Sequence, residues 1–158
     1  MPFKRLLAAA CLCVAASSVF AQIHVEDAWV RATVPQQRAT AAFMKITSDQ
    51  PVRLVGASSV VAPTVEVHEM KMEGGVMKMR PISGIDVVPG RITALTPSGY
   101  HVMLLDLKKQ VKVGDSVPLT LLFEDKDKKR SSVEVMAQAR PLSATSGASM
   151  PAMASMPR

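Results

Sequence analysis

The chain has 158 residues and a formal net charge of +6, and its only cysteines, Cys11 and Cys13, lie close to the N-terminus. A chain of this length suits about one domain. With three histidines, no cysteine after position 13 and no recognisable Ser/His/Asp arrangement, the sequence offers little for nucleophilic catalysis. We therefore do not expect an enzyme.

The first residues have the pattern of a cleaved secretory signal. Lys4 and Arg5 precede an apolar run over residues 6–19. The run leads into Val19-Phe20-Ala21, whose side chains are of the kinds that a signal peptidase accepts before a cleavage site. A basic start, an apolar middle and a small-residue end direct export and cleavage. The run is also shorter than the ~20 residues that span a bilayer. We predict a leader at residues 1–21, a periplasmic location and no stable membrane insertion.

A lipoprotein leader that ends at Cys11 is the alternative. Cleavage there would leave an apolar core of about five residues, below the ~7 that such a signal needs, so we favour cleavage after Ala21. Both cysteines are then lost, and the mature chain must rely on its core in an oxidising compartment. Removal of the leader lowers the formal net charge from +6 to +4, because the leader contains Lys4 and Arg5 but no acidic residue. We expect no nucleic-acid partner for an exported protein. The excess of basic residues would instead favour binding to an acidic protein or to a membrane surface.

Residues 22–139 have the pattern of one all-β domain. Short segments rich in Val, Ile, Leu and Thr alternate with Gly, Pro, Asp and Ser at intervals of about ten residues, as in a sandwich or barrel. No segment keeps a helical period for long. The predicted strands are Ile23–Arg31, Ala41–Thr47, Val52–Val61, Val65–Met70, Val76–Arg80, Ile85–Val88, His101–Leu107, Val117–Phe123 and Ser132–Ala137.

Turn residues predict where the strands of this domain end, and a single tryptophan is a candidate for its core. Gly74 and Gly75 predict a tight hairpin between two methionine-bearing strands. Pro-Gly and Pro-Ser-Gly at residues 89–90 and 97–99 predict further turns. The mixed charges of residues 125–130 favour a solvated hairpin tip, with a docking patch as the alternative. Trp29 is expected to anchor the β core.

The composition changes at the C-terminus. Residues 140–158 are mainly Ser, Ala, Pro and Met without apolar periodicity, so we predict a disordered tail. Met150, Met153 and Met156 recur every third residue, but the neighbouring prolines exclude a helical stripe. These methionines could make a weak, transient contact with Cu(I). The simpler interpretation is a disordered end with no function in copper binding.

Four potential ligands of a soft metal organise the middle of the chain: His68, Met79, His101 and Met103. Residues two apart on a strand point to the same face, so His101 and Met103 can offer an imidazole and a thioether to one point in space. Neutral thioether and imidazole donors favour Cu(I), and also Ag(I), over Zn, Mg or Ca. A methionine on a strand is more often core filler, so the hypothesis depends on the set and its spacing rather than on any single residue.

Other histidine and methionine positions extend this hypothesis. Cleavage after Ala21 would start the mature chain at Gln22-Ile23-His24, whose amine, amides and imidazole could bind Cu(II) in a square plane. The simpler interpretation is that His24 begins a strand. Met70, Met72 and Met77 are interpreted as a soft outer shell or as core filler.

The spacing of the four residues resembles that of the periplasmic PCuAC-type copper(I) chaperones. The resemblance covers roughly residues 23–137, and it implies a cupredoxin-like Greek-key β-barrel or sandwich with Cu(I) held by His68, Met79, His101 and Met103. It also implies delivery towards the dinuclear copper site of cytochrome c oxidase, alongside a Sco-type thiol protein or the oxidase subunit II copper domain. Further similar stretches are Asp27–Arg31, Ala41–Met44, Val67–Met70, Gly75–Arg80 and Gly99–Leu107.

Three functional interpretations follow. The first is a monomeric copper carrier without catalysis. The second keeps copper binding but assigns storage or tolerance, and the third is a metal-free exported β-sandwich that serves as an interaction domain. A blue-copper electron carrier is excluded, because it needs a cysteine thiolate that the mature chain lacks.

Overall fold

The computed structural model describes residues 21–143, which form ten β-strands and no helix, and thus no helix long and apolar enough to cross a membrane. The predicted leader and the predicted methionine tail lie outside the described residues, apart from their boundary positions. The strands are β1 (Ile23–Arg31), β2 (Ala39–Ser48), β3 (Val52–Ser58), β4 (Thr64–Glu73), β5 (Val76–Pro81), β6 (Ile85–Val87), β7 (Thr93–Leu95), β8 (Tyr100–Leu105), β9 (Ser116–Asp125) and β10 (Arg130–Arg140).

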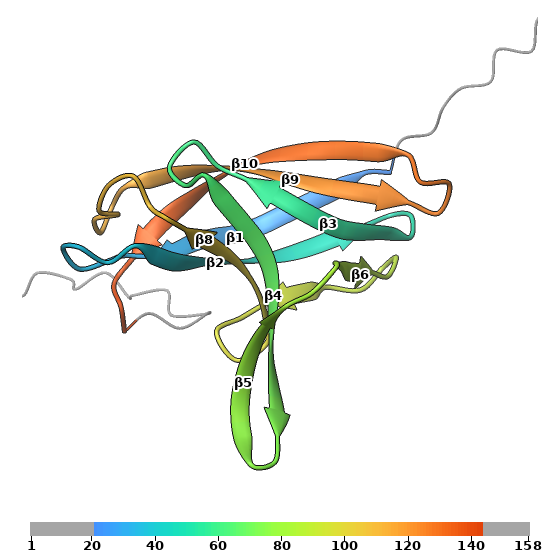
Figure 1. The fold of residues 1–158 in the computed structure, drawn as a ribbon. Helices are drawn as coiled ribbons and strands as arrows, with labels where there is room; N and C mark the ends of the chain where they lie inside the picture. The colour runs from blue at the N-terminus through green and yellow to red at the C-terminus, as the bar shows by residue number, and fades with distance from the viewer. Residues whose placement is uncertain (1–20, 144–158) are drawn as a thin grey trace, which may run out of the picture.

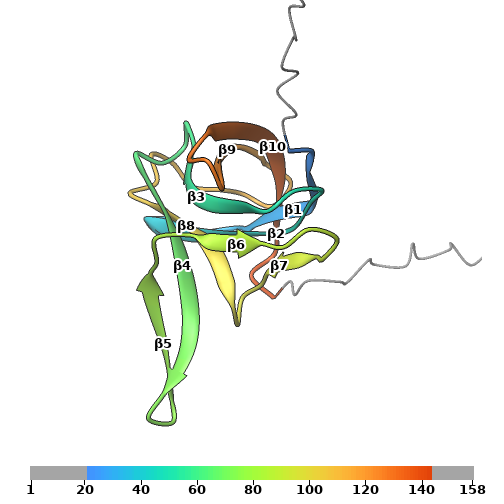
Figure 2. The ribbon, with the colours of Figure 1, turned by 90° about the vertical axis from the view of Figure 1, so that its right-hand side faces the viewer.

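All ten strands belong to one strongly curled sheet. Its hydrogen-bonded order is β5-β4-β8-β2-β1-β10-β9-β3-β6, and β7 pairs with β2 beside this path. The pair β1–β10 is parallel, and the other pairs of the described residues are antiparallel. Viewed end-on, the strands wrap round a common centre like a barrel (Figure 2), although no hydrogen-bonded ladder joins β5 to β6. The predicted all-β fold is confirmed, with a sheet that is not closed.

The main apolar core lies inside this curl. Ala42, Met44 and Ile46 of β2 are buried there, as are Val102 and Leu104 of β8. Their spacing of two residues is the period with which strand side chains return to the same face. The alternate residues of these strands consequently point to the other face, which is where the candidate ligands lie.

Nine of the ten strands correspond to predicted segments. The strand β7 was not predicted, because three residues between two turns are too short to show an alternation. The third predicted strand is too long at its end: β3 stops at Ser58, after which Ser59 and Ala62 form only an isolated bridge. The other boundaries differ by a few residues, as expected where strands end.

The hairpin of β4 and β5 projects from the body of the molecule. Figure 1 and Figure 2 show it extending away from the curled sheet. Gly74 and Gly75 join the strands with φ of 60° and 78°. A two-residue hairpin turn with positive φ at both positions suits glycine, which has no Cβ to clash. The predicted Gly-Gly hairpin is therefore confirmed.

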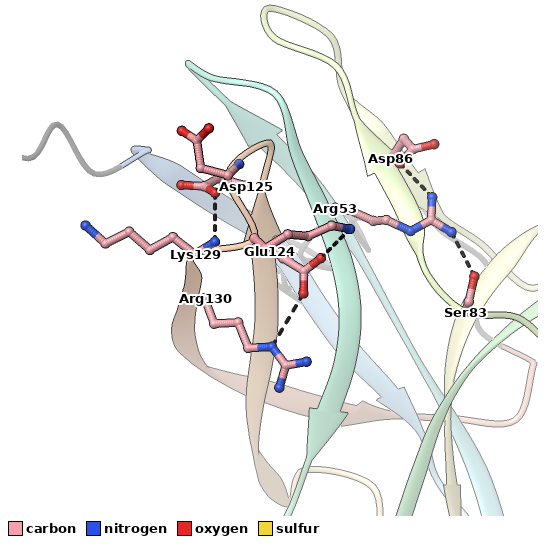
Figure 3. Close-up of polar contacts among 9 residues, drawn as sticks. Arg53, Ser83, Asp86, Glu124, Asp125, Lys129 and Arg130 are labelled. Carbon is pink, nitrogen blue, oxygen red and sulfur yellow. Dashed lines mark hydrogen bonds and ion pairs between the residues drawn. The ribbon is translucent and has the colours of Figure 1, made fainter.

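A second hairpin, β9 to β10, carries the predicted charged tip. Its ion pairs join Lys128 to Glu124 at 3.0 Å and Arg130 to Glu124 at 3.5 Å, and Arg53 on β3 pairs with Asp86 at 2.7 Å (Figure 3). These elements border a surface hollow of about 410 Å³ that contains no His, Met or Cys side chain. Because it offers no soft donor, this hollow is not a candidate for Cu(I) binding.

Candidate metal centre

Three adjacent strands bring the four predicted ligands onto one face of the sheet. In the β4–β8 pair, His68 lies directly opposite His101, and Met103 lies opposite Glu66. Met79 lies on β5, diagonal to His68 across the β4–β5 pair. Directly opposite and diagonal side chains on one face are close enough to interact. Pairing of distant segments thus gathers into one cluster four residues that are separated along the chain.

The imidazole of His101 faces the sulfur of Met79. Its Nε2 is 3.3 Å from Met79 Sδ, and its Nδ1 is 3.2 Å from the carbonyl oxygen of Gly99. A carbonyl can only accept, so we assign the ring hydrogen to Nδ1, which donates to Gly99, and a lone pair to Nε2. A thioether also carries lone pairs and no hydrogen. Two Lewis bases therefore face each other, an arrangement that a soft cation between them would stabilise.

His68 has a similarly fixed ring. Its Nε2 is 2.7 Å from Glu66 Oε2, and because a carboxylate accepts, Nε2 is assigned as the donor. Its Nδ1 is buried and has no hydrogen-bond partner among the described residues. A buried polar atom without a partner is uncommon and calls for an explanation, and its lone pair is what a metal requires.

The two imidazoles are also correctly spaced for one ion. The ring centroids of His68 and His101 are 5.8 Å apart. With metal–nitrogen bonds of about 2 Å, two imidazoles that share an ion have centroids roughly 5–6 Å apart. The distance between the ring centroids is therefore compatible with a common metal.

Burial differs between the nitrogen and the sulfur donors. His68 and His101 are 7% and 3% exposed, whereas Met79 is 51% exposed and Met103 is half-buried. Met79, His101 and Met103 border a surface pocket of about 230 Å³. His101 thus lies at the buried side of this pocket and Met79 at its solvent side, whereas His68 is buried next to His101 and does not border the pocket.

The electrostatic surroundings keep His101 neutral. Burial lowers the pKa of His101 below the usual 6.5, and the neighbouring His68 ring and the positive charge of Arg31 act in the same direction. The hydrogen bond to Gly99 opposes this shift without cancelling it. A neutral imidazole is the form that binds metals. The guanidinium of Arg31 lies 5.6 Å from the ring centroid of Phe43, whose ring is 6.3 Å from that of His101.

The donor types favour a soft metal over a harder one at this position. Among the described residues, no group of three or more His, Cys, Asp or Glu side chains could hold a metal ion. The cluster instead combines two imidazoles with two thioethers, a soft and neutral set. Cu(I) and Ag(I) fit it better than Zn, Mg or Ca.

Two residues that orient the rings were not predicted. Glu66 and Gly99 each lie two positions before the histidine that they contact. For Glu66 the signal was available, because a residue two positions before His68 on a strand shares its face. The role of Gly99 could not be recognised, since a backbone carbonyl is present at every position.

Trp29 is buried as predicted, but it belongs to the site side of the sheet. Its ring centroid is 4.5 Å from that of Phe43, and rings continue from Phe43 through His101 to His68 across four strands. None of these four side chains belongs to the main apolar cluster. The aromatic pair therefore packs beside the histidines and shields them from water on that side.

Comparison with known proteins identifies the family. Residues 23–135 match the family described as "LpqE-like: Putative lipoprotein LpqE-like". The chain belongs to this family. A similar protein is "Putative lipoprotein Lxx21020" of Leifsonia xyli subsp. xyli (strain CTCB07), 32% identical over 104 residues, or 65% of this chain. The matched part spans 63% of the length of that relative.

Solved structures share the fold of this LpqE-like chain. The apo PCuAC domain of PmoF2 is 26% identical with a TM-score of 0.60, over 78% of this chain and 93% of that domain. Apo-DR1885 from Deinococcus radiodurans is 33% identical with a TM-score of 0.53, over 89% of this chain and 95% of that protein. The PmoF2 domain has the same fold in its copper-bound structure, at 24% identity and a TM-score of 0.56. The predicted PCuAC-type resemblance is thereby confirmed.

The secondary copper positions are not part of this cluster. His24 is exposed on β1 and pairs with Thr47, about 20 Å along β2 from Ala41, which lies opposite Met103. The amide of Gln22 bonds Asp49 Oδ1 at 2.7 Å, so a Cu(II) chelate there would have to displace this contact. The His24 site stays a separate prediction. Met150, Met153 and Met156 lie outside the described residues.

Proposed function

We propose that this LpqE-like protein is a periplasmic carrier of Cu(I), which it binds through His68, Met79, His101 and Met103 and passes on without catalysis. The observation that carries this proposal is the 3.3 Å approach of His101 Nε2 to Met79 Sδ. With the ring hydrogen assigned to Nδ1, both atoms present lone pairs. The buried, unpartnered Nδ1 of His68 supports it. The fold shared with PCuAC domains is consistent with the same role.

The geometry favours transfer over permanent retention. The four donors are themselves neutral, so only the carboxylate of Glu66, which contacts His68 from outside the ligand set, offsets the positive charge of Cu(I). A charge that is only partly offset disfavours a deeply buried ion. The half-exposed Met79 allows an incoming ligand to reach the metal from solvent while the two buried imidazoles still hold it. Exchange can then proceed one ligand at a time, with no change in oxidation state.

The recipient that we propose is the dinuclear copper site of cytochrome c oxidase. Transfer would take place in the periplasm to the oxidase subunit II copper domain, directly or through a Sco-type thiol protein, with this protein acting as a monomer. A thiolate on the recipient would give the direction, because soft thiolate ligands select Cu(I). The test is the mixing of the Cu(I)-loaded protein with the isolated subunit II domain. Copper found in the subunit II domain after the two proteins are separated would support this recipient. Copper that stays with the carrier in the presence of both the subunit II domain and the Sco-type protein would favour storage or tolerance.

The ligand set is tested by titration of the mature protein with Cu(I) against a competing chelator. His101→Ala and Met103→Ala should each weaken binding by about 100-fold or more, since loss of a supporting partner of a ligand already costs 10–100-fold. Met136→Ala is the control, because Met136 is a methionine on β10 that lies outside the cluster and is 56% exposed.

The outcomes separate the candidate functions. One ion that is lost in both site variants and kept in the control supports the carrier. Unchanged binding in His101→Ala and Met103→Ala would contradict the ligand assignment. Failure of the native protein to bind any Cu(I) would leave the metal-free interaction domain as the better interpretation.

A further inference from the structure

The methionines that the four-ligand site does not use lie on the projecting β4–β5 hairpin. The strand register places Met70 opposite Met79 and Met72 opposite Met77. Members of such pairs lie on the same face, and on each strand the two methionines are two residues apart. One face of the hairpin is therefore a ladder of two methionine pairs, and its inner pair includes the proposed ligand Met79.

The outer pair is open to solvent. Met72 and Met77 are 59% and 41% exposed, and β4 beyond Met70 pairs only with β5. Burial therefore does not explain why apolar side chains occupy positions 72 and 77, because solvent reaches both of them. Core filling, the ordinary role of methionine, does not apply to this pair.

The opposite face of the hairpin has a different chemistry. It carries Glu69, Glu73, Lys78 and Arg80, which are joined by ion pairs from Arg80 to Glu69 at 2.7 Å, from Arg80 to Glu73 at 3.3 Å and from Lys78 to Glu73 at 3.5 Å. These pairs join four of the five charged side chains on that face, and the fifth, Lys71, also points away from the methionines. The methionine face consequently presents thioethers without a competing cationic side chain among its members.

The spacing of the ladder suits stepwise movement of one ion. Cβ atoms of directly opposite residues are about 5 Å apart, so two flexible thioethers can reach a common ion between them. Successive pairs on one face are about 7 Å apart. The inner pair is in turn connected to the four-ligand site, because Met79 Sδ lies 3.3 Å from His101 Nε2.

We propose that Met72 and Met77, with Met70 beneath them, form a second site for a soft monovalent ion, Cu(I) or Ag(I), at the tip of the hairpin. This site receives the ion from solvent or from a donor and passes it to Met79 and His101 by ligand exchange, with no change of oxidation state. It holds the ion more weakly than the inner site, because it has only thioether donors and is exposed. The proposal rests on the proposed function, since it supplies an ion to the same four ligands.

Titration of the mature protein with Ag(I), followed by NMR of methionine methyl groups labelled with ¹³C, tests this directly. The first equivalent should move the signals of Met79 and Met103, and the second should move those of Met72 and Met77. The double variant Met72→Leu/Met77→Leu keeps the apolar volume and should bind the first ion as the native protein does. Its affinity for the second ion should fall by about tenfold or more. The control Met136→Leu should behave as the native protein does.

The two proposals fail in different ways. In His101→Ala the first event should weaken while Met72 and Met77 still respond. If Met79 and Met103 do not respond in the native protein while Met72 and Met77 do, the carrier proposal fails and the hairpin site stands. The hairpin site is overturned if Met72 and Met77 do not move with two equivalents of Ag(I). It is equally overturned if the second equivalent moves only Met150, Met153 and Met156, or if the double variant takes up both ions as tightly as the native chain.

Discussion

At the scale of single residues, hydrogen-bond acceptors decide which nitrogen of each histidine is available. Glu66 accepts from His68 Nε2 at 2.7 Å, and the Gly99 carbonyl accepts from His101 Nδ1 at 3.2 Å. Partners of this kind hold a ligating imidazole in one tautomer and one orientation. The two rings are thus oriented in the metal-free protein. The carboxylate of Glu66 would also supply a negative charge beside the proposed ion, which the four neutral donors lack.

Glu66→Gln tests this role. We expect Cu(I) affinity to fall by about tenfold, because an amide can keep the hydrogen bond but removes the charge that stabilises the bound cation. Chelator competition measures the loss. Glu69→Gln is the matched control, since Glu69 lies on the same strand but on the opposite face, where it pairs with Arg80. Equal losses in both variants would show that the effect is a general one of charge and not one of His68.

The pKa of His101 gives a prediction about the metal-free protein. Burial lowers it below 6.5, so the folded state keeps this ring neutral at a pH where the unfolded chain binds a proton. Stability from this group is therefore complete above about pH 6.5 and is lost as the pH falls towards the lowered pKa. An NMR titration of the His101 ring should give a pKa below that of the same residue in the urea-unfolded chain. A pKa of 6.5 or higher in the folded protein would contradict the assigned burial effect.

At the scale of elements, Gly84 fixes how the chain returns from the projecting hairpin to the body. It has φ +156°, and a Cβ at this position would lie 2.5 Å from the backbone oxygen of Leu54. The neighbouring Ile85 pairs with Leu54 at the start of β6. Backbone atoms in a ladder cannot move aside as a flexible side chain can, so only glycine fits.

Gly84→Ala should lower the free energy of unfolding by about 2 kcal/mol or more, as overpacking of a close contact does. Urea unfolding measures it. Gly56→Ala is the control, because a Cβ on Gly56 would meet no atom within 4 Å beyond its chain neighbours, and a change there should stay within about 0.5 kcal/mol. If both variants unfold at the same urea concentration as the native protein, the close approach to Leu54 is not a constraint.

The sequence predicted elements better than it predicted their partners. Alternation and the Gly-Gly turn were sufficient for the β4–β5 hairpin, because hairpin pairing is local. The pairing of His68 with His101 joins segments far apart in the chain, and no local pattern specifies it. The ligand spacing was informative only through resemblance to a family. The tautomers were beyond prediction, since they depend on Glu66 and on a backbone carbonyl at Gly99.

At the scale of the whole molecule, the proposed ion links an edge strand to the body. The strand β5 pairs only with β4, and all of its side chains are exposed, so few contacts hold it. Elements with few buried contacts open locally at low free energy. An ion shared by Met79 on β5 and His101 on β8 would connect strands that are not neighbours in the sheet.

Hydrogen exchange should therefore show where the ion acts. With free Ag(I) at about 100 times the dissociation constant, binding stabilises the closed state by about 2.7 kcal/mol, so amides of β5 should exchange up to about 100-fold more slowly. The turn between β9 and β10 should not change, because its local opening leaves the ion bound. In Met79→Leu at saturating Ag(I), three ligands remain on β4 and β8, so the ion should still bind while β5 loses its added protection. Slow exchange of β5 in that variant would mean that the ion acts on the hairpin through β4, and that Met79 is not the link.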